Sequence, residues 1–163
     1  MTNRPSVPET DSESPDFVIE SEYGRILLKS NCKASFFDNL EMDDGLGHFS
    51  HYSSIIKKID SFNKYAERED GRVTLAVRDP NVVVGYCIGS YPEPNDRWTL
   101  LGKLMYELAA LELSTNFRGL NLAYRLLHST MNDDFFEDKS AYMCGYSWHW
   151  DLEGKNLTAG QYR

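Results

Sequence analysis

The fold is decided by the stretch Tyr106-Glu-Leu-Ala-Ala-Leu-Glu-Leu-Ser-Thr-Asn-Phe-Arg-Gly-Leu-Asn-Leu-Ala-Tyr-Arg-Leu-Leu127. Residues 108–113 are apolar except for Glu112, and residues 114–121 are mostly polar. After them, apolar residues recur at the spacing of one helical face, at Leu122, Ala123, Leu126, Leu127 and Met131. The stretch therefore predicts a strand, a loop and a helix.

A helix through the first part of this stretch is the alternative. Apolar residues on one helical face would then be Leu101, Leu104, Met105, Leu108 and Leu111. Leucine, alanine, glutamate and methionine all favour helices, so periodicity alone does not decide between the two interpretations.

The loop before Leu122 has the features of an anion-binding site. Backbone N–H groups at a helix N-terminus attract anions. Arg118 lies just before that point, and its guanidinium group can bind two phosphate oxygens at once. The loop therefore predicts a ligand that carries phosphate groups.

The segment from Leu111 to Ala123 resembles the acetyl-CoA motif of the GNAT N-acetyltransferase superfamily. In that motif Gln or Arg is followed by two residues, Gly, one residue, and Gly or Ala. Arg118 and Ala123 match, and Asn121 stands at the central Gly. Asn tolerates left-handed backbone geometry, so we expect the loop to keep its shape. The resemblance implies acetyl-CoA as co-substrate without a metal, bound by Leu111, Leu113, Arg118, Gly119, Leu120, Asn121, Leu122 and Ala123.

Two other segments resemble the acetoin-utilisation (AcuA) group of this superfamily, whose members are protein acetyltransferases. They are Tyr91-Pro-Glu-Pro-Asn-Asp-Arg-Trp98 and Tyr146-Ser-Trp-His-Trp-Asp-Leu-Glu-Gly154, and with the cofactor motif they span about half of the chain. The resemblance implies acetylation of a lysine in a target protein, such as an acyl-CoA or acetyl-CoA synthetase.

The GNAT resemblance also implies an α/β (α+β) fold with a mixed central sheet flanked by helices. We expect this domain over residues 17–163, with the last helix and final strands of the fold missing. A sheet edge left exposed there would favour a homo-oligomer. Residues 1–16 are rich in proline and acidic residues, a composition that predicts a disordered tail.

Sequence patterns predict the remaining elements. Phe17 to Leu28 predicts one or two strands, and Lys33 to Leu40 a short helix. A longer helix is predicted by the apolar stripe Tyr52, Ile55, Ile56, Ile59, Phe62 and Ala66. Arg72 to Arg78 and Val82 to Ser90 predict a hairpin whose second strand is central. By resemblance, Lys139 to Trp148 is a strand that parts from the Tyr106–Leu113 strand to hold the pantetheine arm.

Composition narrows the class of protein. The 163 residues carry a formal net charge of −8, which argues against a nucleic-acid partner. Three cysteines without a spacing pattern indicate free thiols in a reducing compartment. No membrane span or signal peptide is apparent, so a cytoplasmic location without a membrane partner is the default. His48 and His51 have the spacing of metal ligands, but no third ligand is nearby.

Acetyl transfer to lysine needs a base, because the free amine has a pKa of about 10.4. On a buried strand Glu107 would share a face with Ala109, Leu111 and Leu113. An unpaired carboxylate there is costly unless it faces a pocket, and the GNAT resemblance places the base at Glu107. The alternative is a solvated or salt-bridged Glu107 at the strand entrance. Glu112 is the second candidate, expected on the opposite face with a structural role.

The resemblance implies two further roles. The Leu113 N–H would bind the oxyanion, and Tyr162 is a candidate general acid. Trp148, His149 and Trp150 are interpreted as a structural aromatic cluster; the alternative is that they belong to the acceptor site, with His149 as an acid or base. Two other functions stay open, namely acetylation of a small amine and a non-catalytic module that binds CoA or a protein.

Overall fold

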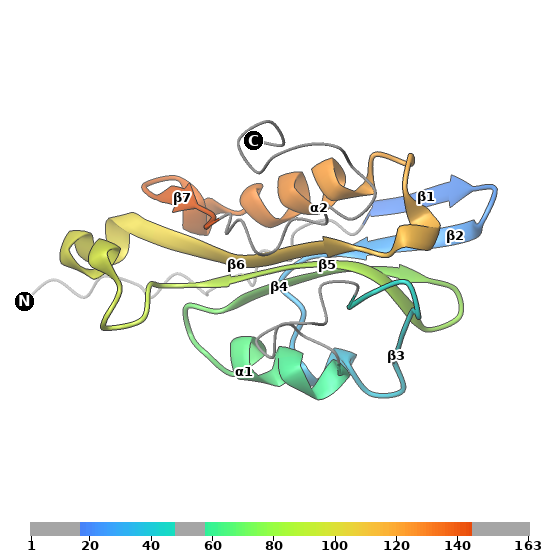
Figure 1. Ribbon diagram of the computed structural model, residues 1–163, viewed down its shortest axis with the longest axis horizontal. Coiled ribbons are helices and arrows are strands. Elements are labelled where there is room, and N and C mark those ends of the chain that lie inside the picture. Colours follow the sequence, from blue (N-terminus) through green and yellow to red (C-terminus); the bar gives the residue numbers. More distant parts are fainter. Residues whose placement is uncertain (1–16, 48–57, 145–163) are drawn as a thin grey trace, which may run out of the picture.

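The computed structural model describes residues 17–47 and 58–144, which form one mixed sheet with helices on both faces (Figure 1). The strands are β1 (Phe17–Ser21), β2 (Gly24–Lys29), β3 (Glu41–Met42), β4 (Arg72–Arg78), β5 (Val82–Ser90), β6 (Met105–Leu113) and β7 (Ser140–Tyr142). The α-helices are α1 (Asn63–Ala66) and α2 (Leu122–Met131). The sheet order is β1-β2-β4-β5-β6-β7, with β3 beside β5. This architecture confirms the predicted fold class.

The hairpin expected from the sequence is present, and the segment predicted as one or two strands forms a second one. The Phe17–Leu28 segment forms β1 and β2, which pair antiparallel. β4 and β5 have the predicted bounds and also pair antiparallel. β5 lies between β4 and β6 and is almost entirely buried, because an apolar run with no polar alternation suits a strand covered on both faces.

The strand interpretation of the central stretch is correct, and the helical alternative is wrong. β6 is nine residues long and pairs antiparallel with β5 from Glu107 to Leu113. Leu101 and Leu104, which would have continued a helical stripe, lie instead in the 3₁₀ segment η3 (Arg97–Leu104). Gly102 interrupts this segment with φ 57° and ψ −138°, outside helical geometry.

The predicted helix over the Tyr52–Ala66 stripe is not continuous. Lys58 is extended, and a 3₁₀ turn (Ile59–Phe62) precedes the four-residue α1. Within the described part of the stripe, Phe62 lies on the buried side, because its ring packs against Tyr86 in the sheet. Tyr52, Ile55 and Ile56 lie outside the described residues. The predicted short helix over Lys33–Leu40 is likewise reduced to a 3₁₀ turn, Ala34–Phe36. His48 and His51 lie outside the described residues.

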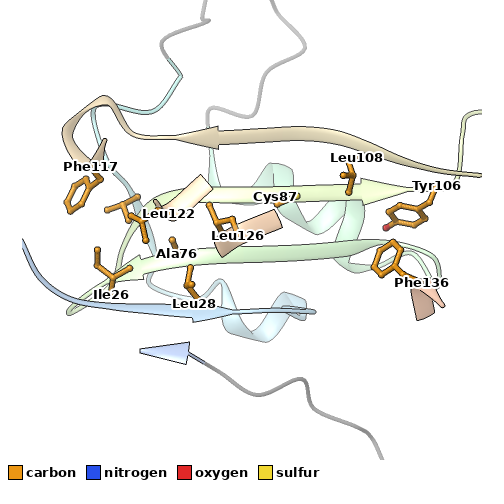
Figure 2. Close-up of a cluster of buried hydrophobic side chains, with 11 residues drawn as sticks. Ile26, Leu28, Ala76, Cys87, Tyr106, Leu108, Phe117, Leu122, Leu126 and Phe136 are labelled. Carbon is orange, nitrogen blue, oxygen red and sulfur yellow. The ribbon is translucent and has the colours of Figure 1, made fainter. Parts of the chain in front are cut away.

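Each face of the sheet buries its own apolar core. Figure 2 shows the core on the α2 face, which extends from Phe117 to Phe136 and includes Leu122 and Leu126 of α2. The core on the α1 face comprises Cys32, Phe37, Phe62, Val73, Leu75, Val77, Val83, Tyr86 and Ile88. The two cores fix β6 between α1 and α2, so its two faces can serve different purposes.

Candidate active site

A β-bulge interrupts β6 at Ala109. Ile88 of β5 pairs with Ala110, and the next residue, Gly89, pairs with Leu108. Ala109 is therefore an extra residue without a partner on β5, and its side chain is exposed. A bulge shifts the alternation of side chains between the two faces of a strand.

The bulge overturns the predicted face assignment of the two glutamates. Beyond it, Leu111 and Leu113 pack on the α2-side core. Glu107 lies on the α1 side near Tyr65, so it does not share a face with those leucines. Glu112 also faces the α1 side, where it bonds a buried tyrosine. The two carboxylates therefore occupy the same face, and simple alternation could not reveal this.

The outer edge of β6 is largely unpaired. β7 runs parallel to β6 but pairs with it only over Met105–Glu107. Among the described residues, 108–113 have no strand partner on this edge. β7 lies within the strand predicted over Lys139 to Trp148, and it pairs with β6 only at its start. Residues 145–148 lie outside the described part of the chain.

Two backbone N–H groups of β6 point to this unpaired edge. The Ser114 N–H donates to the Val84 carbonyl at 2.8 Å. Bonded and non-bonded pairs alternate in an antiparallel ladder, so the N–H groups of Leu111 and Leu113 point away from β5. They can therefore donate to a ligand that lies along the edge of β6.

The loop before α2 has the backbone geometry of an anion site. Asn121 takes φ 57° and ψ 23°, the left-handed conformation expected for this position. Gly119 also has a positive φ, of 90°. The Asn121 side chain makes no capping bond, so it leaves the first N–H groups of α2 to a ligand. Arg118 is exposed beside them.

The remaining residues of the motif contribute chiefly through their backbone. Leu122 is fully buried in the α2-side core, and Leu120 and Ala123 are partly buried. Their side chains anchor the loop and the helix, while the N–H groups of Leu122 and Ala123 belong to the first turn of α2. An anion at this helix end would also be favoured by the helix dipole.

A segment from early in the chain holds the loop that follows β6. Asp43 accepts hydrogen bonds from Ser114 Oγ at 2.5 Å and Asn116 Nδ2 at 3.0 Å. The Thr115 N–H donates to the Gly45 carbonyl at 3.1 Å. A Cβ on Gly45 would overlap Ser114 Oγ, so any other residue there would have to displace the hydroxyl that bonds Asp43. Sequence reasoning missed this clamp because its two parts are far apart in the chain.

Glu112 is a fully partnered structural carboxylate. It is only 6% exposed. Its Oε2 accepts a hydrogen bond from the Tyr86 hydroxyl at 2.5 Å, and its Oε1 accepts one from the Gly47 N–H at 2.7 Å. Both oxygens are therefore occupied by bonds that tie β5 and the Asp43–Gly47 loop to the end of β6.

Glu107 has a different environment. Its carboxylate has no hydrogen-bond or ion-pair partner among the described residues. Burial raises the pKa of Glu107, and the nearby carboxylates of Asp96 and Glu93 raise it further. Tyr65 of α1 lies close enough that Glu107, together with burial, raises the pKa of the Tyr65 hydroxyl. Glu107 is thus a half-buried carboxylate without a salt bridge in the described structure.

Several predicted features fall outside the described residues. These are Tyr162 with its neighbours Asn156 and Ala159, and the Trp148-His149-Trp150 cluster. Within residues 17–47 and 58–144, no group of three or more potential metal ligands is found. No helix in those ranges has the length and apolar character needed to cross a membrane.

A groove of about 320 Å³ lies between α2 and the β1–β2 hairpin. It is lined by Phe17 and Leu28 of the β1–β2 hairpin and by Asn121, Tyr124, Arg125, His128 and Ser129. None of these residues comes from β6 or β7. The groove is therefore separate from the edge of β6 that is unpaired among the described residues. Asn121 lines the groove and also belongs to the loop before α2.

Known proteins were compared with this chain at the levels of sequence and structure. No protein-family model matches the sequence. A crystal structure of an acetoin utilization protein from Exiguobacterium sibiricum 255-15 aligns with a TM-score of 0.75 and 26% identity, over 91% of this chain and 69% of that chain. The mixed sheet and the loop before α2 define a domain with a GNAT-type fold.

Curated relatives identify the family within that class. The acetoin utilization protein AcuA of Bacillus licheniformis is 30% identical over 147 residues, which are 89% of this chain and 68% of the relative. AcuA of Bacillus subtilis (strain 168) is 35% identical over 96 residues, 58% of this chain and 45% of the relative. The chain belongs to the AcuA family and spans less than half of the Bacillus subtilis relative in that alignment.

Proposed function

We propose that this chain transfers the acetyl group of acetyl-CoA to a lysine of a protein, with Glu107 as the general base. The observation that carries the proposal is the half-buried carboxylate of Glu107, which has no partner among the described residues and lies beside the edge of β6 that they leave unpaired. By family resemblance, the expected acceptor is a lysine of an acyl-CoA or acetyl-CoA synthetase.

The chain has suitable groups for each part of acetyl-CoA. Its phosphates suit the uncapped first turn of α2 and the exposed Arg118. Its amide-rich arm suits the outward N–H groups of Leu111 and Leu113, which can pair with it as a strand would. When bound, acetyl-CoA supplies an activated thioester carbonyl.

Glu107 would accept the proton that an ammonium group must lose before its nitrogen can react. A raised carboxyl pKa brings the base closer to the pKa of the amine, which favours this proton transfer. Asp96 and Glu93 contribute by their negative charge, which also attracts a cationic amine.

The oxyanion role assigned to Leu113 by resemblance does not fit this base. Six strand residues at about 3.3 Å each separate Glu107 from Leu113 by roughly 20 Å. One acetyl group cannot lie near both. Ala109 is two residues from Glu107, and a bulge leaves the backbone of its extra residue unpaired. We therefore assign the oxyanion to the Ala109 N–H and leave Leu111 and Leu113 to the cofactor arm.

Replacement of Arg118 by alanine tests the phosphate site. Losing a charge-assisted hydrogen bond costs about 1.5–3 kcal/mol, so acetyl-CoA affinity is expected to fall roughly tenfold to a hundredfold. Isothermal titration calorimetry measures this directly. Arg125→Ala is the matched control, because Arg125 is an exposed arginine of α2 that lines the separate groove. Equal losses in both variants would contradict the assignment.

The pH dependence of turnover tests the surroundings of Glu107. The base must be ionised, so kcat/KM is expected to rise with pH through the raised pKa of Glu107. Asp96→Asn removes a neighbouring negative charge, lowers that pKa and should move the acidic limb to lower pH. Asn can still accept the Trp98 N–H bond that Asp96 accepts now.

Thiol release from acetyl-CoA, followed over a pH series, gives this profile. Asp79→Asn is the control, because it removes a carboxylate far from Glu107. Glu107 pairs with Ser90 at the end of β5, whereas Asp79 precedes the start of that strand. An acidic limb that stays in place in Asp96→Asn, or that moves equally in Asp79→Asn, would argue against Glu107 as the titrating base.

A further inference from the structure

Three leucines in the turn between β5 and β6 extend into solvent. Leu100 is 92% exposed, Leu104 59% and Leu101 47%. Figure 1 shows this segment, η3, projecting beyond the ends of β5 and β6, away from both helices. Single exposed leucines are ordinary, but a cluster of them marks an interaction surface.

The turn is a structured element that fixes these leucines outward. The Asp96 carboxylate accepts the Trp98 N–H at 2.8 Å, and Thr99 Oγ1 donates to the Glu93 carbonyl at 2.7 Å. The Trp98 ring packs on Tyr142 of β7, with ring centroids 5.6 Å apart. Collapse of the leucines onto the protein would require breaking these contacts.

The same turn provides negative charge next to Glu107. Asp96 and Glu93 are the two carboxylates whose charges act on Glu107. Glu93 forms an ion pair with Arg68, with Oε1 and Nη1 3.1 Å apart. Asp96 is therefore the one of the two carboxylates that has no cationic partner among the described residues. The two cations of the turn, Arg97 and Lys103, lie over the rings of Trp98 and Tyr91.

We propose that Leu100, Leu101 and Leu104 form the docking site for the protein acceptor, and that its reactive lysine is flanked by large apolar residues. This proposal rests on the lysine acetyltransferase function proposed above. A cationic lysine fits the acidic side of the turn, and its apolar neighbours fit the leucines.

The spacing along the chain supports this occupant. Leu104 precedes Glu107 by three residues, a span of about 10 Å in a strand. An extended acceptor with its lysine at Glu107 would therefore place residues a few positions away over the leucines. A second copy of the chain could cover leucines, but it would not account for the carboxylates beside them.

Two synthetic peptides test the proposal. Both contain one lysine, which is flanked by leucines in one peptide and by serines in the other. Peptide binding is measured by fluorescence anisotropy in the presence of CoA, and acetyl transfer by mass spectrometry. The variant is Leu100→Ser/Leu104→Ser, and the control is Val18→Ser, at a residue 46% exposed on the opposite edge of the sheet.

The wild-type chain is expected to bind and acetylate the leucine-flanked peptide roughly tenfold or more better than the serine-flanked one. The double variant should lose that preference, while Val18→Ser keeps it. Equal use of both peptides by the wild type, or binding of neither, would overturn the docking site. So would a double variant that keeps the preference and only dissociates a dimer in sedimentation, because the leucines would then bind a second copy.

Failure of the proposed function gives a different result. In that case the wild type would still bind the leucine-flanked peptide preferentially, and the double variant would still lose this binding, but no acetyl-lysine would form. Such a result supports the docking surface and refutes lysine acetyl transfer. The substituted leucines are solvent-exposed, so the double variant is expected to fold, which circular dichroism checks.

Discussion

Glu107→Gln is expected to lower kcat by roughly a hundredfold or more while acetyl-CoA affinity stays at the wild-type value. Glutamine has nearly the same shape as glutamate but cannot accept the proton of an ammonium group. The phosphate loop and the outward N–H groups of β6 lie further along the chain, so cofactor binding does not depend on this carboxylate. Steady-state thiol release and calorimetry separate the two quantities.

The same variant is expected to be more stable than the wild type at neutral pH. Because the pKa of Glu107 is raised, the folded state disfavours its ionised form. The wild type therefore loses stability as pH rises from the ordinary carboxyl pKa through the raised one, and below that range the two proteins should be equally stable. Denaturant melts at two pH values measure this. A destabilised Glu107→Gln with normal turnover would show that the carboxylate has a structural role.

Glu112→Ala is expected to show the opposite behaviour, with a large loss of stability. The substitution leaves the buried Tyr86 hydroxyl and the Gly47 N–H without their acceptor. Each orphaned group costs about 1–3 kcal/mol, so the free energy of unfolding should fall by about 3 kcal/mol. For a domain of this size the melting temperature would drop by roughly 6–12 °C.

Conservative substitutions distinguish a structural role from a catalytic one. Glu112→Gln keeps a side-chain oxygen that can accept one of the two hydrogen bonds, so turnover should be retained. In a double-mutant cycle, adding Tyr86→Phe to Glu112→Ala should cost less than Tyr86→Phe alone, because both substitutions remove the same Tyr86–Glu112 hydrogen bond. A stable Glu112→Gln protein without turnover would make Glu112 the base and contradict the assignment of Glu107.

Local chemistry made much of the fold predictable. The apolar run of β5 predicted a central strand, and the residues Asp79-Pro80-Asn81 just before it favour a turn. Asn121 was expected to tolerate a left-handed backbone, and it does so at the start of α2. The backbone shape of the loop before α2 was therefore predictable from the residues of the loop itself.

Features that depend on distant partners were not predictable. The bulge at Ala109 arises from its pairing with β5, and it moved Glu107 and Glu112 onto one face. The apolar stripe before Ala66 suggested a continuous helix. In its described part, Phe62 buries its ring against Tyr86 of the sheet from a short 3₁₀ turn instead. Asp43 gave no signal in sequence because its partners Ser114 and Asn116 lie 71 and 73 residues further along the chain, after β4, β5 and β6.

Acetyl transfer to the leucine-flanked lysine peptide is the most direct test of the proposed function. The purified chain is incubated with acetyl-CoA and this peptide, and the products are resolved by mass spectrometry. We expect acetyl-lysine and free CoA in equal amounts with the wild type, and neither above background with Glu107→Gln. A wild-type chain that binds acetyl-CoA but leaves the peptide unmodified across the pH range would contradict the proposed lysine acetyltransferase function.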